Sequence, residues 1–232
     1  MQKIEYFEEP FPHYVIDEFL TPRAARDILE ECIDLEPFYE QAKILGDADI
    51  VPDNCDTCKT KEKSYRSLTR DNQTISLDKL FFNKRIKSPT LSFLEHAITD
   101  PNFIELMDKS KSIFPITNRL FTSESMLSRY GKCDFYGWHR DSALDSLVRQ
   151  RIVTCSYYIN KEPLNFDGGR LLLRYNDKVK IKKVEPKHNR MVIFPSDKVH
   201  AVEYVNLTGK DWDEGRFSVQ HWLGVEGPHR FR

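Results

Sequence analysis

The hydrophobic pattern of the chain is mostly helical in its first half and strand-like in its second half. Residues 13–20 alternate apolar and polar positions, which predicts a strand. A helix is predicted to begin at Pro22, because Thr21 is a suitable N-cap and proline is favoured at the first helical position. The apolar residues that recur at helical spacing, and should form its buried face, are Ala25, Ile28, Leu29 and Cys32.

Two more helices and one long polar stretch are predicted before residue 123. The helices begin after Ser88 and after Asp100, since each is a capping residue followed by proline. Residues 44–74 are polar, charged and poor in periodicity. They predict a long loop or lid, of the kind that is often functional.

The segment from residue 123 onward predicts about eight short strands separated by turns. The alternating or aromatic and β-branched runs are SMLSRY, FYGWHRD, RIVTCSYYIN, RLLLRY, KVKIKKVE, RMVIFP, HAVEYVN and RFSVQHWL. Such regular spacing is typical of a sandwich or barrel. We therefore expect a mainly β fold with α additions and a single domain over residues 1–232. In it, residues 1–122 supply a strand, helices and the lid, and residues 123–225 form the β core.

The charge balance of the chain excludes a strong electrostatic attraction to nucleic acid. Its 232 residues carry 35 Lys and Arg against 36 Asp and Glu, which leaves a net charge of -1. A nucleic-acid partner would require a concentrated basic face. The N-terminal MQKIEYFEEP lacks the apolar core of a signal peptide, and no apolar run is long enough to span a membrane. We expect a soluble, cytoplasmic protein without a membrane partner, and the oligomeric state stays open.

The five cysteines are odd in number and scattered, which favours reduced thiols over a disulfide framework but does not exclude one bridge. Cys55 and Cys58 form a Cys-x-x-Cys pair without the second pair that a four-ligand zinc site requires. Two interpretations stay open for the pair: loop thiols that oxidise together, or a zinc site completed by a distant histidine such as His96. The cysteines are Cys32, Cys55, Cys58, Cys133 and Cys155.

His139 and Asp141 lie two positions apart at the end of a predicted strand, so both side chains can face the same ion. A mononuclear iron site of the facial type requires two histidines and one carboxylate, with the remaining positions open. His200 is the best-placed second histidine, because it begins an apolar strand just after a Pro-Ser-Asp turn. The alternative is a polar turn beside an unrelated surface histidine.

Two further strands carry polar side chains on one face. Thr154, Ser156 and Tyr158 alternate with apolar residues, as in a sheet that borders a cavity or solvent. Arg216 and Ser218 share a face of the last strand with Gln220. A guanidinium fork beside a hydroxyl suits a carboxylate, although an arginine at the start of a strand can also be a surface charge.

Taken in order, these segments resemble the Fe(II)- and 2-oxoglutarate-dependent oxygenases, and within them the prolyl-4-hydroxylase-like branch, over residues 124–223. The resemblance implies a double-stranded β-helix, or jelly roll, with N-terminal helices packed on one sheet. It places the catalytic iron ligands on His139, Asp141 and His200. The cosubstrate-binding residues that it implies are Arg216, assisted by Ser218, together with Tyr130 and Tyr158.

The same resemblance implies the cofactors and the reaction. Fe(II), 2-oxoglutarate and O2 are expected, and ascorbate is left open as a reductant. The reaction is hydroxylation of an unactivated C–H bond with succinate and CO2 as co-products. The carboxylate of Asp141 favours hydroxylation over halogenation, since halogenating relatives carry a small residue at that position.

The substrate implied by the branch is a prolyl residue in a protein or peptide. A free amino acid or small metabolite is the alternative, because a long polar lid can close over a small molecule. The third interpretation is a non-catalytic β-helix protein that binds a ligand. Trp138, Tyr136 and the loop after Asp141 are expected to border the substrate, and Arg149 and Arg151 either meet a substrate carboxylate or remain exposed.

Overall fold

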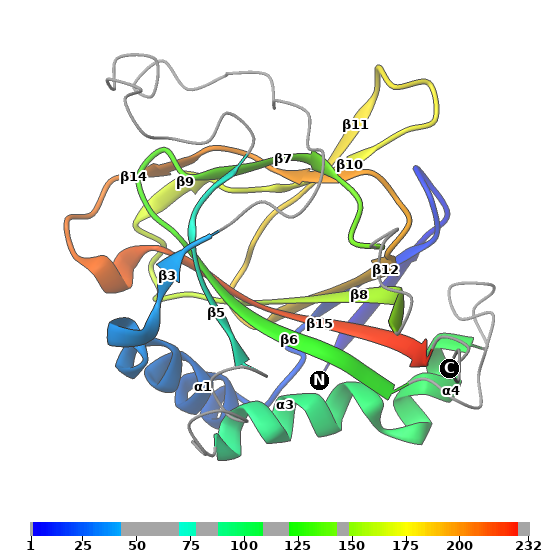
Figure 1. The fold of residues 1–232 in the computed structure, drawn as a ribbon, viewed down its shortest axis with the longest axis horizontal. Helices are drawn as coiled ribbons and strands as arrows, with labels where there is room; N and C mark the ends of the chain where they lie inside the picture. Colours follow the sequence, from blue (N-terminus) through cyan, green and yellow to red (C-terminus); the bar gives the residue numbers. More distant parts are fainter. Residues whose placement is uncertain (1, 43–69, 78–87, 109–120, 143–148, 227–232) are drawn as a thin grey trace, which may run out of the picture.

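The computed structural model describes residues 2–42, 70–77, 88–108, 121–142 and 149–226, arranged in three layers (Figure 1). A layer of helices covers one face of a large sheet, and a smaller sheet lies over the opposite face. The helices are α1 (Pro22–Asp34), α3 (Pro89–Thr99) and α4 (Pro101–Asp108), with single 3-10 turns η1 (Glu36–Phe38) and η2 (Trp212–Glu214).

Eight strands form the large sheet in the order β1-β2-β12-β8-β15-β6-β5-β3. Their bounds are β1 Lys3–Phe7, β2 His13–Asp17, β12 Arg190–Pro195, β8 Arg149–Ile159, β15 Arg216–Glu226, β6 Phe121–Tyr130, β5 Gln73–Ser76 and β3 Glu40–Gln41. The long central strands β6, β8 and β15 pair antiparallel over most of their length.

Five strands form the smaller sheet in the order β11-β10-β13-β7-β4. Their bounds are β11 Ile181–Val184, β10 Leu171–Arg174, β13 His200–Val202, β7 Phe135–His139 and β4 Arg70–Asp71. A separate pair joins β14 (Val205–Leu207) to β9 (Phe166–Gly168). The predicted mainly β architecture with helices on one sheet is confirmed.

The predicted helix starts are confirmed, and the caps explain them. The Thr21 hydroxyl accepts the backbone N–H of Ala24, and the Ser88 hydroxyl accepts that of Leu91. Asp100 Oδ1 accepts the backbone N–H groups of Asn102 and Phe103. Each side chain therefore satisfies amide groups that the first helical turn leaves without an intrahelical partner.

The prediction of one loop over residues 44–74 is wrong at its C-terminal end, and the rest of that stretch lies outside the described residues. Arg70–Asp71 and Gln73–Ser76 are the strands β4 and β5. These strands pair with β7 and β6. They are too short and too polar to show an alternating hydrophobic pattern, and only pairing to strands remote in sequence defines them. The run HAVEYVN is likewise two strands, β13 and β14, and β9 was not predicted.

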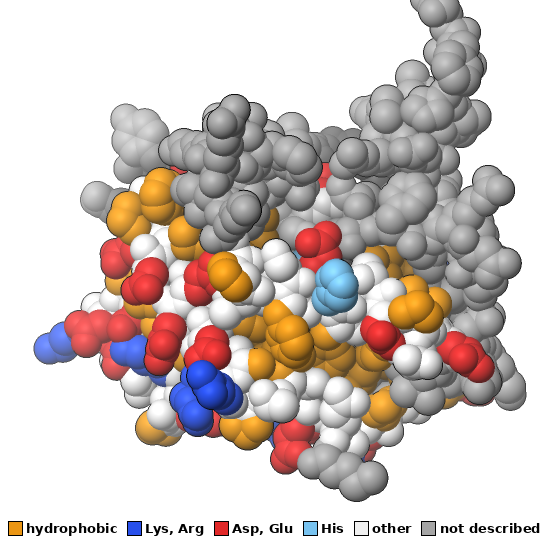
Figure 2. Space-filling model, turned by 90° about the horizontal axis from the view of Figure 1, so that it is seen from below, with side chains coloured by type: hydrophobic (Ala, Val, Ile, Leu, Met, Phe, Trp, Pro, Cys, Tyr) orange, Lys and Arg blue, Asp and Glu red, His pale blue; other side chains and the backbone are white. Residues whose placement is uncertain are grey.

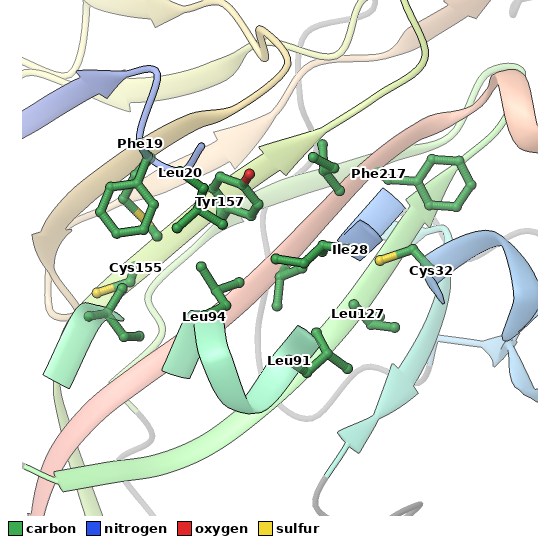
Figure 3. Close-up of a cluster of buried hydrophobic side chains, with 14 of the residues drawn as sticks. Phe19, Leu20, Ile28, Cys32, Leu91, Leu94, Leu127, Cys155, Tyr157 and Phe217 are labelled. Atoms are coloured by element: carbon green, nitrogen blue, oxygen red, sulfur yellow. The ribbon is translucent and has the colours of Figure 1, made fainter. Parts of the chain in front are cut away.

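The main hydrophobic core lies between the helices and the large sheet (Figure 3). Ile28 and Cys32 of α1 and Leu91 and Leu94 of α3 lie in this core together with Tyr157 of β8. Ile28 and Cys32 belong to the face of α1 that the helical spacing predicted to be buried. A second cluster fills the space between the two sheets on the side of β2 and β12, with Phe11, Val15, Tyr158, Leu173, Val192 and Phe194 among its members. Both faces of the large sheet are therefore covered, in part by apolar side chains.

The helical side of the molecule carries no concentrated basic patch among its described side chains. Seen from below, it shows scattered acidic side chains, few Lys and Arg, and apolar side chains between them (Figure 2). The Phe93 side chain of α3 is 51% exposed to solvent. No helix within the described ranges is long and apolar enough to cross a membrane.

The cysteines are only partly as expected. Cys32 and Cys155 are free and buried. Cys133 is disulfide-bonded, so the expectation of reduced thiols is wrong at that position. The Cys55 and Cys58 pair lies outside the described residues, and both of its interpretations stay predictions.

Candidate active site

The three residues expected to bind iron come together where β7 ends and β13 begins, on two inner strands of the smaller sheet. His139 ends β7 and His200 begins β13, and the two residues face each other in the antiparallel register. Asp141 follows β7 by two residues. One donor atom from each residue lies within 4.8 Å of the others. The His139 Nε2 to Asp141 Oδ1 and His200 Nε2 to Asp141 Oδ2 distances are both 3.4 Å.

Both imidazole rings are oriented by backbone carbonyls. His139 Nδ1 lies 2.7 Å from the Gly137 carbonyl oxygen, and His200 Nδ1 lies 3.0 Å from that of Lys198. A proton on Nδ1 that is donated to a carbonyl leaves the lone pair of Nε2 free. Since both Nε2 atoms face Asp141, the donor set of two imidazoles and a carboxylate fits a divalent iron ion.

Burial and mutual charge determine the protonation of this cluster. Burial, followed by the neighbouring His200, lowers the pKa of His139. Burial opposes charge on Asp141 as well, but the two histidines outweigh it and hold the pKa of this carboxyl well below its usual range. Burial also acts to lower the pKa of His200, and the Asp141 carboxylate raises it overall. A charged carboxylate beside a neutral His139 is the state that a metal ion requires.

Asp141 is held by groups of the neighbouring strands. The Thr154 hydroxyl donates to Asp141 Oδ2 at 2.8 Å and lies 2.9 Å from the Ser196 hydroxyl. The Asp141 backbone N–H donates to the Ser196 carbonyl, and Arg151 donates to the Asp141 carbonyl at 3.1 Å. The carboxylate is thereby fixed relative to the two histidines before any ion binds.

Arg216 lies across the interior from this cluster, at the start of β15. Its side chain is 1% exposed, and its Nε donates to the Gly169 carbonyl at 2.8 Å. The guanidinium carbon lies 4.7 Å from the Tyr130 ring centre and 4.9 Å from the Tyr158 ring centre. No described residue supplies a carboxylate to this buried charge, which is therefore available to an anionic ligand.

The two tyrosines that the resemblance implies as cosubstrate-binding residues lie against the guanidinium. Tyr130 faces Arg216 in the register of β6 and β15, and Tyr158 faces Ser218 in that of β8 and β15. Burial is the main cause that raises the pKa of each phenol. Both therefore stay neutral and can donate a hydrogen bond.

Gly169 is required for the position of Arg216. Its φ of 64° lies in the left-handed region, which glycine tolerates best. A Cβ atom there would come within 2.8 Å of Arg216 Cδ. The Gly168-Gly169 turn thus lets the backbone approach the buried arginine side chain.

Two side chains border the histidines: Tyr136, which was expected near the substrate, and Arg70, which the sequence did not identify. Tyr136 stacks on His139 with 3.6 Å between ring centres, and the Arg70 guanidinium lies 4.3 Å above the Tyr136 ring. Arg70 comes from β4, inside the stretch interpreted as a loop. An arginine in a short polar segment carries no signal in the sequence that it is 8% exposed and beside a metal site.

Two expectations for the substrate border need correction. Trp138 packs with Phe135, Leu172 and Ala201 on the other face of the smaller sheet, away from His139. Arg151 is neither exposed nor pointed at a substrate carboxylate: it pairs with Glu124 and lies 4.0 Å over the Trp222 ring. The Arg149 side chain and residues 143–148 of the following loop lie outside the described residues.

Comparison with known proteins identifies the family of this core. Residues 125–224 match the sequence profile of the 2OG-Fe(II) oxygenase superfamily. This segment, which is less than half of the chain, is similar to the core of the 2OG-Fe(II) oxygenases. The cofactor and cosubstrates that the family implies are Fe(II), 2-oxoglutarate and O2.

Similarity beyond residues 125–224 extends over nearly the whole chain at low identity. An uncharacterized PKHD-type hydroxylase of Synechocystis is 24% identical over 96% of this chain, which corresponds to 66% of that relative. A Pseudomonas putida prolyl-4-hydroxylase superposes with a TM-score of 0.61 at 19% identity, covering 93% of both chains.

A prolyl hydroxylase from Trichoplax adhaerens, solved with a hypoxia inducible factor peptide, gives a TM-score of 0.60 at 14% identity. The alignment covers 91% of this chain and 82% of that one. These likenesses confirm the double-stranded β-helix fold.

Proposed function

We propose that the chain is an Fe(II)- and 2-oxoglutarate-dependent dioxygenase that hydroxylates an unactivated C–H bond, with residues 1–232 acting as one oxygenase domain. The observation that carries this proposal is the pairing of two features. A His-Asp-His cluster lies at one sheet, and a buried arginine without a carboxylate partner among the described residues lies at the other. A dicarboxylate that chelates a metal at one end and meets the arginine at the other satisfies both.

Each site residue has a distinct task in this proposal. His139, Asp141 and His200 hold the metal through Nε2, carboxylate oxygen and Nε2. Arg216 and Ser218 bind the distal carboxylate of 2-oxoglutarate, and Tyr130 and Tyr158 enclose the guanidinium and exclude water. Bound iron with 2-oxoglutarate and O2 supplies the oxidising chemistry, which releases succinate and CO2.

The substrate we propose is a prolyl residue in a protein or peptide. This proposal is supported by the folds of the two prolyl hydroxylases to which the chain is similar. Hydroxylation of a free amino acid or a small metabolite is the second candidate. The chain spans about two thirds of the length of the curated relative that it matches.

Succinate release on iron-loaded protein tests the reaction and the substrate together. We expect turnover with 2-oxoglutarate that increases with prolyl peptides more than with free amino acids. His200→Ala should abolish turnover, because only two of the three metal ligands remain. Arg216→Ala should raise the apparent KM for 2-oxoglutarate by about tenfold or more.

Matched controls separate these effects from general damage to the fold. His96→Ala and Arg23→Ala remove a histidine and an arginine from exposed helical positions. Both variants should keep the turnover and the apparent KM for 2-oxoglutarate of the unsubstituted protein. Unchanged succinate production by His200→Ala would disprove the metal site. Tight binding of 2-oxoglutarate without turnover on any substrate would favour a non-catalytic binding protein.

A further inference from the structure

A chain of hydrogen bonds links β6 to the buried arginine through Gln220. The Ser128 hydroxyl donates to Gln220 Oε1 at 3.0 Å. Gln220 Nε2 then donates to Ser218 Oγ at 2.8 Å, and Arg216 donates to the same oxygen at 3.1 Å. The Ser128 bond sets the direction of the Gln220 amide, because its carbonyl end is occupied.

This arrangement dictates what the Ser218 hydroxyl can do. A hydroxyl oxygen has two acceptor lone pairs and one proton to donate. Both lone pairs of Ser218 are engaged by N–H donors, one of them from a guanidinium. Ser218 is 1% exposed, and no acceptor among the described side chains or carbonyls receives its proton. The proton is therefore available only to a group that enters the interior.

The register places Gln220 between the two ends of the site. On β8, Ser218 faces Tyr158, Gln220 faces Ser156, and Trp222 faces Thr154. Tyr158 contacts Arg216, whereas Thr154 donates to Asp141. Gln220 thus lies on the stretch of strand that a ligand joining metal to arginine would cover.

We propose that Gln220, anchored by Ser128, is a positioning residue that orients the Ser218 hydroxyl as a donor toward the distal carboxylate of the cosubstrate. This inference rests on the proposed function and deepens it. Three donors then converge on that end of the ligand: two N–H groups of Arg216 and the Ser218 O–H. A set of donors with no acceptor selects a carboxylate over a neutral amide of the same shape, because the NH2 group of the amide would face donors only.

Binding of two nearly isosteric ligands measures this selectivity. Dissociation constants are determined without oxygen, on Mn(II)-loaded protein, for 2-oxoglutarate and for 2-oxoglutaramate, its distal amide. Gln220→Met keeps the length of the side chain but cannot donate. We expect it to weaken 2-oxoglutarate about tenfold and to reduce the preference for carboxylate over amide. Gln220→Glu should weaken the dicarboxylate further, because the glutamate accepts the Ser218 proton and repels the ligand.

A double-mutant cycle with Ser218→Ala tests whether Gln220 acts through Ser218. If it does, Gln220→Met should have little further effect in the Ser218→Ala background. Full additivity of the two losses would overturn the proposal. Gln2→Met is the matched control, since Gln2 donates only to the Phe19 carbonyl at the N-terminus, and its constants should equal those of the unsubstituted protein.

The outcomes distinguish this inference from the function on which it rests. Failure of the unsubstituted protein to bind 2-oxoglutarate would overturn the proposed function, and this inference with it. Normal binding by that protein together with unchanged constants and selectivity in Gln220→Met would overturn only the role of Gln220. Should Gln220→Met not fold, Ser128→Ala removes the anchor instead, and a loss of selectivity of about threefold is expected.

Discussion

At the scale of single residues, Asp141 is held differently from the two histidines. Each histidine lies in a paired strand, and its imidazole is oriented by one backbone carbonyl. Asp141 lies after the end of β7 and is held by a hydroxyl on its carboxylate and by bonds to both its N–H and its carbonyl. The position of the negative charge of the site therefore depends on side-chain and backbone bonds outside the strand ladder.

Thr154→Val tests the role of the hydroxyl on Asp141 without changing side-chain shape. We expect metal affinity to fall roughly tenfold or more, as is usual when a hydrogen bond to a ligand is removed. The measurement is a titration of metal-free protein with Mn(II) or Co(II). Thr154→Ser should retain affinity because the donor remains, and Thr90→Val on α3 is the control elsewhere. Equal affinity of Thr154→Val and the unsubstituted protein would show that the hydroxyl does not support the ligand.

At the scale of elements, strand β15 separates structural and chemical roles by its two faces. Phe217, Val219 and Leu223 pack in the core against the helices. Arg216, Ser218 and Gln220 face the interior between the sheets. The start of this strand is fixed by Arg129, whose guanidinium donates twice to the Trp212 carbonyl in η2 and lies 5.0 Å from the Trp212 ring centre.

Gly215→Ala should disturb the start of β15. Gly215 has φ of -63°, so alanine is compatible with the backbone. Its Cβ would nevertheless come within 2.7 Å of Arg129 Nε and 3.0 Å of the Tyr130 carbonyl oxygen. We expect the free energy of unfolding to fall by about 1–3 kcal/mol, together with weaker 2-oxoglutarate binding. Chemical denaturation and ligand titration measure the two effects.

Gly209→Ala is the matched control for this loop. The atoms nearest to its Cβ would be those of the Glu214 carboxylate, which accepts bonds from the Asp211 N–H and from Asn165. Displacing this carboxylate should lower the free energy of unfolding but leave the Arg129 contact, and therefore 2-oxoglutarate binding, unchanged. An equal loss of 2-oxoglutarate binding from the two substitutions would mean that the loop, and not the Arg129 contact, determines the position of Arg216.

At the scale of the whole molecule, stacking the large sheet between helices and the smaller sheet buries two histidines outside the metal cluster. His221 on β15 is 1% exposed, and His13 on β2 is fully buried. His221 Nδ1 lies 2.8 Å from the Ser125 hydroxyl, and burial lowers its pKa to about 4. Burial is also the first cause that lowers the pKa of His13 to about 4.

These histidines make the stability of the fold dependent on pH. As pH falls below the ordinary histidine pKa of about 6.5, the unfolded chain takes up protons that the folded chain does not. The free energy of unfolding therefore decreases from pH 6.5 to about 4, by up to roughly 3 kcal/mol for His221. Below about pH 4 the folded chain also binds the proton, and the whole contribution of the neutral histidine to the free energy of unfolding has been lost.

Denaturation across this pH range compares His221→Gln with the control His96→Gln, at an exposed position of α3. The slope of the free energy of unfolding against pH gives the number of protons taken up on unfolding. This number should be smaller by close to one in His221→Gln and unchanged in the control. Carboxylates contribute equally to all variants. A slope that is identical in the three proteins would contradict a neutral, buried His221.

Much of the fold could be predicted because local rules determine it. The helix starts at Pro22, Pro89 and Pro101 follow from a capping residue before proline. The runs around Leu127, Tyr157 and Phe217 alternate over part of their length, since one face of each strand packs on the helices. The short strands β4 and β5 gave no such signal, because their pairing to β7 and β6 depends on residues 50 or more positions away.

The sequence by itself determined the fold class, the order of the site residues and the face of each strand on which they lie. Periodicity and residue chemistry are properties of the chain, so they can be read before it folds. Only the tertiary structure brought Arg70 over Tyr136 and linked Ser128 to Ser218 through Gln220. These contacts depend on register between strands remote in sequence, and a register is settled only when the two sheets and the helical layer pack together.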